Sequence, residues 1–378
     1  MKHLKANRYT YVLYTFILLL TFSSCDKDDD IKGGTDSEIT EDSTIPDITP
    51  ITPIGDVYVS GRNETGSSIS KPIYFKNGEV VELEGVGSHS EANFIEVSGE
   101  DVHVLGWSKS IRQPVYWKNG VPQILEHPNP SSIAILGDIA IPIDIAVSGD
   151  DVHMIMQRSS SIGLDYAIHY WKNDVRTLIP SNEGKENYAS GLTVNKDDVY
   201  IFGQQIFKER AEFASDGEWP IATYWKNGVS VSVTNGKRTS WVQQMVIKGD
   251  DVYVGYTEHI EGGSLSYILK NGTQILAFDN RENLQDFIVK DGIVHSVSRN
   301  SEGEVKYYRN NVATTITSAI SVPKKIRMHN NDIYISGTFY QGESESVHSQ
   351  ILKNNVLFSD LEYDGSKENI EIYDMTIN

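Results

Sequence analysis

A short unit recurs seven times along this chain and constrains the fold more than any other feature. Its first half is a polar turn, then Val or Ile, then Tyr or His, as in Asp56-Val57-Tyr58 and Asp251-Val252-Tyr253. The copies start at residues 56, 101, 151, 198, 251, 293 and 332, so the intervals are 39 to 53 residues. This is the period of four-stranded propeller blades. Helical repeats of similar period are excluded because the apolar residues alternate with period two and are rich in Val, Ile, Tyr and Thr.

The second half of the unit predicts a tight hairpin in every copy. A two-residue type I′ turn needs positive φ at both central positions, which Asn followed by Gly, Asn or Asp tolerates. The seven copies carry Lys76-Asn77-Gly78, Lys118-Asn119-Gly120, Lys172-Asn173-Asp174, Lys226-Asn227-Gly228, Lys270-Asn271-Gly272, Arg309-Asn310-Asn311 and Lys353-Asn354-Asn355. With an apolar strand before each turn-Val-Tyr segment, every unit supplies four strands, named a to d in chain order.

The first unit lacks its strand a, because a Pro-containing run, residues 50–54, precedes Asp56. The chain ends with the segment 374–378, which fits strand a and has no strand b after it. We therefore predict that the last strand completes the first blade and closes the ring, which removes exposed sheet edges. The predicted fold class is all-β, a seven-bladed β-propeller of four-stranded blades over residues 54–378.

The N-terminal segment predicts export and lipid anchoring. Residues 1–24 have the layout of a signal peptide, with Lys2, Lys5 and Arg8 before an apolar stretch over residues 11–22. The Ser-Ser-Cys end resembles a bacterial lipoprotein cleavage site, which implies a lipid such as palmitate on Cys25. Cys25 is the only cysteine, so an intrachain disulfide cannot form. Residues 25–53 read as a flexible acidic tether, because their composition cannot bury a core.

Charge and missing motifs exclude several function classes. The net charge is −19, and loss of residues 1–24, with three basic and no acidic residues, would bring it to −22. Nucleic acid is a poor partner for such a surface. We find no nucleophile elbow, phosphate loop or zinc-hydrolase motif, and we predict no catalytic residues, no cofactor and no metal site. His103, His153 and His295 stand where the other units have Tyr, so we interpret them as polar-tipped rings of strand b. The acidic pairs before strand b, such as Asp250-Asp251, are interpreted as turn caps and not as calcium ligands.

The loops between strands b and c and between blades vary in length, whereas the other turns are uniform, so we expect the variable-loop face to carry function. Its longest b-to-c loop runs from Gln204 to about Ile221 and contains Trp219. The first residues of the seven a strands should ring the channel mouth on this face, and ring closure should bring Asp286, Lys325 and Asp374 together. Such a group could bind a polyol or a cation, could act as an acid and base pair, or could form only a solvated salt-bridge row. The candidate ligand-binding residues are Asp286, Lys325, Asp374, Asp144, Gln244 and Trp219.

The repeated Asp-Val-Tyr-Val-x-Gly and Tyr-Trp-Lys-Asn-Gly units after a lipoprotein signal resemble the seven-bladed propeller lipoproteins of bacteroidete bacteria. The run Asp26-Lys27-Asp28-Asp29-Asp30 looks like the acidic signal that sends bacteroidete lipoproteins to the outer face of the outer membrane, the alternative being a solvated charge run, so we expect a lipid-anchored outer-membrane protein exposed at the cell surface. We expect a non-catalytic binding or scaffolding module for a glycan or a protein. The alternatives are an extracellular carbohydrate-active enzyme that uses carboxylates at the channel mouth, and a structural subunit of a membrane assembly.

Overall fold

The computed structural model describes residues 55–64, 69–125, 139–159, 166–207, 219–279, 281–316, 320–341, 346–362 and 370–378. The predicted signal peptide, Cys25 and the tether lie outside these residues, as does the part of the longest variable loop at 208–218. In the described ranges, no helix is long and apolar enough to cross a membrane.

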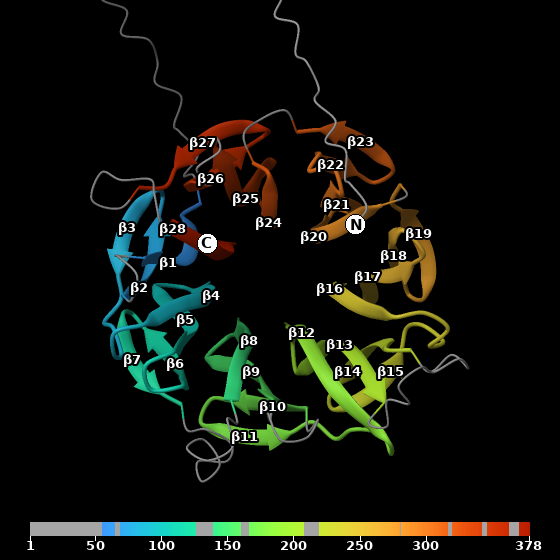
Figure 1. The fold of residues 1–378 in the computed structure, drawn as a ribbon, viewed down its shortest axis with the longest axis horizontal. Helices are drawn as coiled ribbons and strands as arrows, with labels where there is room; N and C mark the ends of the chain where they lie inside the picture. Colours follow the sequence, from blue (N-terminus) through green and yellow to red (C-terminus); the bar gives the residue numbers. More distant parts are fainter. Residues whose placement is uncertain are drawn as a thin grey trace, which may run out of the picture. The chain divides into compact units, whose positions relative to one another are not determined.

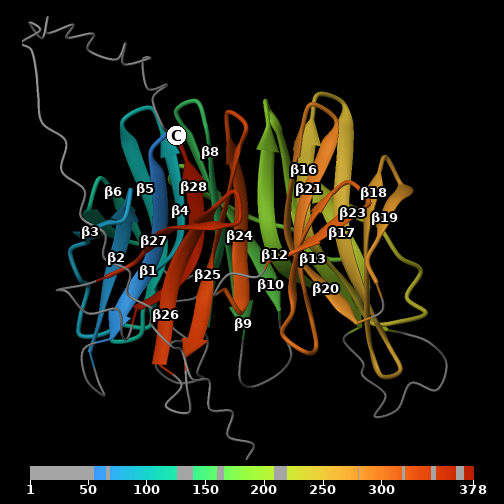
Figure 2. The ribbon, with the colours of Figure 1, turned by 90° about the horizontal axis from the view of Figure 1, so that it is seen from above.

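Seven four-stranded antiparallel sheets form a ring around a central channel; Figure 1 looks along the channel, and Figure 2 shows the ring edge-on after a 90° turn. The prediction of an all-β, seven-bladed propeller is confirmed. The first blade has the order β28-β1-β2-β3, and each of the other six is built from four consecutive strands.

The strands of each blade follow one order from the channel to the rim. The inner strands are β28 (Ile370–Ile377), β4 (Ser90–Ser98), β8 (Ile139–Ser148), β12 (Lys185–Asn195), β16 (Ser240–Lys248), β20 (Glu282–Lys290) and β24 (Val322–His329). The second strands are β1 (Val57–Glu64), β5 (Asp101–Ser108), β9 (Asp151–Ser159), β13 (Asp198–Phe207), β17 (Asp251–Ile260), β21 (Ile293–Asn300) and β25 (Asp332–Gln341). The third strands are β2 (Ser70–Lys76), β6 (Gln113–Lys118), β10 (Ala167–Lys172), β14 (Ile221–Lys226), β18 (Gly263–Lys270), β22 (Val305–Arg309) and β26 (Ser346–Lys353). The rim strands are β3 (Glu79–Glu82), β7 (Val121–Ile124), β11 (Val175–Leu178), β15 (Val229–Ser232), β19 (Thr273–Ala277), β23 (Val312–Thr315) and β27 (Val356–Asp360).

The C-terminal strand closes the ring as predicted. β28 pairs antiparallel with β1, with Val59 opposite Met375. The last residue continues this pairing, because the Asn378 N–H donates to the Asp56 carbonyl at 3.0 Å. The first and last strands of the chain that the structure describes therefore share one sheet.

The repeat residues tie the two turns of each blade together. In blade 5, Asp251 accepts from Lys270 Nζ and Asn271 Nδ2, both at 2.8 Å, and the Val252 N–H donates to Asn271 Oδ1 at 2.8 Å. The same Asp-Lys-Asn arrangement recurs in the blades that carry the remaining acidic turns, at Asp56, Asp101, Asp151, Asp198 and Asp332. The acidic residues therefore cap the neighbouring c-to-d turn and not their own turn, which corrects our interpretation. Asn77 and Gly78, with φ of 54° and 88°, show the predicted positive φ at both positions.

The apolar core is divided among the interfaces between neighbouring blades. Trp117 and Trp225, from the Tyr-Trp-Lys segments, are fully buried. Trp225 packs with Ile155 and Ile168 of the preceding blade, for example, and seven such clusters alternate with the seven blades. Each blade is therefore stabilised by its two neighbours, as in other repeat folds.

Every inner strand carries a β-bulge near its middle. In β4 the register with β5 shifts between Ala92 and Phe94, and the other six inner strands shift at the equivalent point. A bulge adds one unpaired residue and bends the strand, so it leaves backbone groups without ladder partners. These seven bulges determine the geometry of the channel.

Candidate functional site

The seven ring residues predicted from the sequence are adjacent in space, but they do not lie at the channel mouth. Each directly follows the bulge, near the middle of its inner strand, as Asp144 does in β8. The prediction that they are the first residues of strand a is therefore wrong by several residues. The ring consists of Asp374, Phe94, Asp144, Gly191, Gln244, Asp286 and Lys325 in blade order.

The ring carboxylates bind backbone N–H groups of the next blade. Asp144 accepts from its own neighbour, the Ile145 N–H, at 2.9 Å and from the Leu192 N–H of blade 4 at 2.9 Å. Asp374 of blade 1 accepts from the Ile95 N–H of blade 2 at 3.1 Å. A buried N–H without a partner would cost about 1–3 kcal/mol, so these bonds stabilise the blade junctions.

Asp286 shows this role most fully. Its Oδ1 accepts from the Phe287 N–H at 2.9 Å and from Gln244 Nε2 at 2.8 Å. Its Oδ2 accepts from the Ile326 N–H at 3.0 Å and from Arg327 Nη1 at 2.7 Å. The residue is 1% exposed and does not line the channel cavity, so Asp286 holds blades 5, 6 and 7 together instead of facing a ligand.

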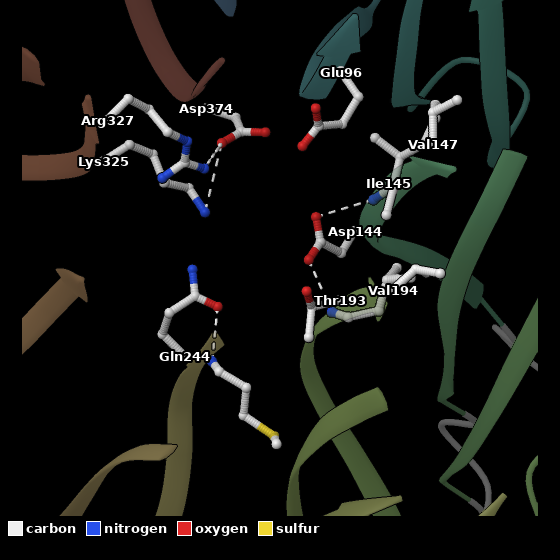
Figure 3. A pocket seen from close by; sticks show the side chains of 13 residues that line it. Glu96, Asp144, Ile145, Val147, Thr193, Val194, Gln244, Lys325, Arg327 and Asp374 are labelled. Atoms are coloured by element: carbon white, nitrogen blue, oxygen red, sulfur yellow. Dashed lines mark hydrogen bonds and ion pairs between the residues drawn. The ribbon is translucent and has the colours of Figure 1, made fainter. Parts of the chain in front are cut away.

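Two basic residues of β24, Lys325 and Arg327, lie beside Asp374, as Figure 3 shows. Arg327 Nη2 lies 3.7 Å and Lys325 Nζ 3.5 Å from Asp374 Oδ1. Burial alone would lower the pKa of Lys325, but the carboxylates of Asp374 and Asp286 outweigh it and raise this pKa. Lys325 therefore stays charged, and the predicted grouping of Asp286, Lys325 and Asp374 is present around Arg327.

These residues border a polar cavity of about 240 Å³ in the channel. Its walls include residues 144–147 and 192–194, which run from the ring toward the C-terminal ends of β8 and β12. The cavity therefore lies on the side of the uniform a-to-b turns and not on the variable-loop side. Trp219 is not among its lining residues.

The wall across the cavity from Lys325 and Arg327 carries two carboxyl groups, Glu96 and Asp144 (Figure 3). Glu96 accepts from Thr376 Oγ1 at 3.1 Å, and Asp144 accepts backbone N–H groups only; within the described ranges neither makes an ion pair. Burial raises the pKa of both Glu96 and Asp144 to about 7, with the charge of Asp374 adding to the shift; Lys325 opposes the shift of Asp144, and Arg327 opposes that of Glu96.

Glu96 and Arg327 were missed by our sequence reasoning. Glu96 lies two residues after the ring residue Phe94, and Arg327 lies two residues after Lys325. The period-two alternation of a strand places each of them on the same side of the sheet as its ring residue. The period-two alternation of the inner strands could therefore have identified both residues as channel-facing.

A second cavity, of about 500 Å³, lies on the variable-loop face and contains Trp219. It is bordered by the connection between blades 4 and 5 (residues 237–239) and by the β17–β18 turn (residues 259–263). Trp219 is 44% exposed, and its backbone N–H donates to the Gly236 carbonyl at 3.2 Å. His259 meets Trp241 edge to face, with ring centroids 6.0 Å apart. We refer to this cavity as the Trp219 groove.

The strand histidines pair with tyrosines, as our interpretation of them as polar-tipped rings implies. His103 Nδ1 lies 2.6 Å from Tyr116 Oη, and the pairs His153–Tyr170 and His295–Tyr307 repeat this contact at 2.7 and 2.6 Å. Burial lowers the pKa of each of these histidines. Across the ranges that the structure describes, no three His, Cys, Asp or Glu residues are grouped to hold a metal ion.

Comparison with known proteins adds information on the fold. No protein-family model and no curated protein matches the sequence. The structure is similar to that of a Mycobacterium tuberculosis puromycin-hydrolyzing peptidase, with a TM-score of 0.52 and 10% identity over 83% of this chain. This chain covers 53% of the length of that peptidase. The β-propeller domain of the Trilobed protease from Pyrococcus furiosus matches over 69% of this chain and 80% of its own, with 14% identity and a TM-score of 0.43. At 10% identity, the likeness to the peptidase bears on the propeller fold alone.

Proposed function

We propose that the protein is a lipid-anchored cell-envelope protein whose propeller binds an uncharged glycan in the Trp219 groove. The observation that carries this proposal is the exposed indole of Trp219 in a groove on the variable-loop face. A tryptophan ring gives a large, rigid apolar contact at low conformational cost. Polar side chains beside such a ring supply the hydrogen bonds that orient a hydroxylated ligand.

The charges around the groove favour a neutral ligand. Lys237 and Arg238 lie beside Glu258 and Glu261, and Arg238 Nη1 is 3.6 Å from Glu258 Oε2. Among the described residues at the groove, these two cations and two carboxylates balance, which favours an uncharged ligand. A protein ligand would need a large apolar patch or charge complementarity, and the groove offers neither.

The enzymatic alternative relied on Asp286 and Asp374 as an acid and base pair, and Asp286 is not accessible to a substrate. Asp286 is almost fully buried, and its four hydrogen bonds are all internal. A glycosidase needs two carboxyl groups that reach the scissile bond. We therefore do not propose catalysis, and Asp286 is reassigned from ligand binding to the blade junctions.

The test is a screen of the purified full chain against neutral oligosaccharides, with Trp219→Ala, Trp219→Phe and Phe358→Ala in parallel. Phe358, 36% exposed on the rim strand β27, is the matched control for loss of an exposed aromatic ring. If stacking on Trp219 contributes about 2 kcal/mol, Trp219→Ala weakens binding at least tenfold. Trp219→Phe and Phe358→Ala should change it little. Glycan binding that is equal in Trp219→Ala and wild type would contradict the proposal, as would the absence of glycan binding.

The anchoring part of the proposal rests on residues 1–25 of the sequence and is tested separately. In a bacterial host, Cys25→Ala should release the protein from the membrane fraction and abolish incorporation of labelled palmitate. An unchanged membrane fraction would refute the anchor and leave the groove proposal intact.

A further inference from the structure

The channel cavity carries more negative than positive charge. Four carboxyl groups (Glu96, Asp144, Asp286 and Asp374) and two cations (Lys325 and Arg327) border it or support its wall. Arg327 is paired with Asp286 at 2.7 Å, and Lys325 lies near Asp374. Glu96 and Asp144 on the other wall make no ion pair within the described ranges, so four ionised carboxyl groups face two cations and the cavity has a deficit of positive charge.

A second observation shows that the cavity lacks one polar partner on its basic side. Among the residues that the structure describes, none donates a hydrogen bond to Asp374 Oδ1, although the Asp374 side chain is only 5% exposed. The Lys325 ammonium lies 3.5 Å from this oxygen and, within the described ranges, donates no hydrogen bond. Buried polar atoms are nearly always paired, so these two groups need a partner that both donates and accepts. A hydroxyl group meets this requirement.

The size and ligand geometry of the cavity limit what could fill it. Its volume of about 240 Å³ corresponds to about eight water molecules at ~30 Å³ each. This space suits one small polar molecule and not a polymer. A metal ion is disfavoured because the described carboxyl groups are not clustered to coordinate one. An ammonium ion needs only hydrogen-bond contacts with separate acceptors.

We propose that the channel cavity binds a small molecule with one primary ammonium group and several hydroxyl groups, such as an amino sugar or an amino alcohol. The ammonium group lies between Glu96 and Asp144, and a hydroxyl group bridges Lys325 and Asp374 (Figure 3). The cations of β24 repel the ammonium group from their side and so fix the orientation of the ligand. This site shares no lining residue with the Trp219 groove and does not depend on the function proposed for it.

The chosen probe is glucosamine, and glucose is its matched control, because the two differ only by an ammonium group in place of a hydroxyl. We expect calorimetry on the full chain at pH 7 to detect glucosamine and to show at least tenfold weaker binding of glucose. N-acetylglucosamine, whose nitrogen carries no charge, should resemble glucose. Equal binding of glucose would overturn the proposal, as would no binding of glucosamine, or calcium ions that bind more tightly than glucosamine and displace it.

The variant Glu96→Gln removes one charge and keeps the acceptor for Thr376, so the blade contact at this point is retained. It should weaken glucosamine binding at least tenfold, whereas Asp251→Asn, at the surface turn, should leave it unchanged. Lowering the pH from 7 to 6 should weaken wild-type binding about fivefold for each carboxyl group that must ionise, given pKa values near 7. The charged groups that face these two carboxyls are Asp374 from β28 and Lys325 and Arg327 from β24. Binding that is independent of pH, or unchanged in a folded Glu96→Gln variant, would also overturn the proposal.

Discussion

Replacing Asp286 by Ala should destabilise the ring strongly, whereas the same change at Asp251 should have little effect. Both aspartates accept from a basic side chain and an amide side chain, but they differ in burial and in the two backbone N–H groups that only Asp286 accepts from. Asp286 is 1% exposed, and the side chain of Asp251 is 39% exposed. Loss of Asp286 leaves the Arg327 guanidinium, the Gln244 amide and two backbone N–H groups without their acceptor. Breaking a buried pair costs about 3–5 kcal/mol, and a surface pair contributes about 0–1 kcal/mol.

The assay is urea unfolding followed by tryptophan fluorescence, in which the free energy of unfolding is extrapolated to water. We expect Asp286→Ala to lower this free energy by about 3–5 kcal/mol with an unchanged m-value, and Asp251→Ala by less than about 1 kcal/mol. Asp286→Asn should fall between them, since it keeps one acceptor oxygen and loses the charge. Equal losses for Asp286→Ala and Asp251→Ala, or a loss below about 1 kcal/mol for Asp286→Ala, would refute the assignment of Asp286 to the blade junctions.

Two further predictions concern the residues next to this ring. The pKa of Glu96 is raised in the folded state, so its contribution to stability is present below its unfolded value of 4.5 and is lost as the pH rises through about 7. Glu96→Gln should therefore be more stable than wild type at pH 8, by at most about 3 kcal/mol, and should lose most of this advantage at pH 5. Thermal unfolding at pH 8 and pH 5 measures the difference. An equal stability difference at the two pH values would contradict the prediction. Gly106→Ala should cost more than about 2 kcal/mol, because an added Cβ would lie 1.9 Å from the Glu91 carbonyl oxygen, whereas Gly99→Ala should cost about 1–2 kcal/mol, since its Cβ meets open space at a φ of 59°. Urea unfolding of both variants checks this order, and an equal cost would disprove the close-contact argument.

The sequence sufficed to predict the fold because the repeat reports on turns and strand pairing. Asn at positive φ, Tyr-Trp-Lys before it and the period of the copies all depend on local backbone geometry, which neighbouring residues specify. The closure of the ring followed from counting strands, since β28 had no other partner. Each of these steps needed no knowledge of distant contacts.

The position of the ring within the channel could not be predicted in the same way. The bulge adds one residue to each inner strand, but the inserted residues, such as Asn93, Gln243 and Tyr373, share no type that would reveal it. The bulge bends the strand and leaves backbone N–H groups that the ring side chains then accept from. Polar residues that resembled ligand contacts therefore proved to be partners of the backbone. Trp219 was equally hard to place, because the length of a loop does not determine where its last residue packs.

Ring residues with a carboxylate alternate with ring residues that lack one, and an odd number of blades means that this alternation cannot be complete. Three blades supply a carboxylate to a following blade that lacks an acceptor, so Asp374 is followed by Phe94, Asp144 by Gly191, and Asp286 by Lys325. Seven blades leave one without a partner, and there Gln244 accepts from its own Met245 N–H and donates to Asp286.

The charges divide unevenly for the same reason. Both cations stand on blade 7, where they lie beside the carboxylates of the two adjacent blades. Asp144 on blade 3 is far from them along the ring, and Glu96 on blade 2 adds a second charge to that wall. The uniform repeat thus builds the channel, and the differences among its ring residues place an acidic wall opposite the two cations of β24. A ligand that enters this channel must match that polarity, which is why exchange of an ammonium group for a hydroxyl is the decisive comparison.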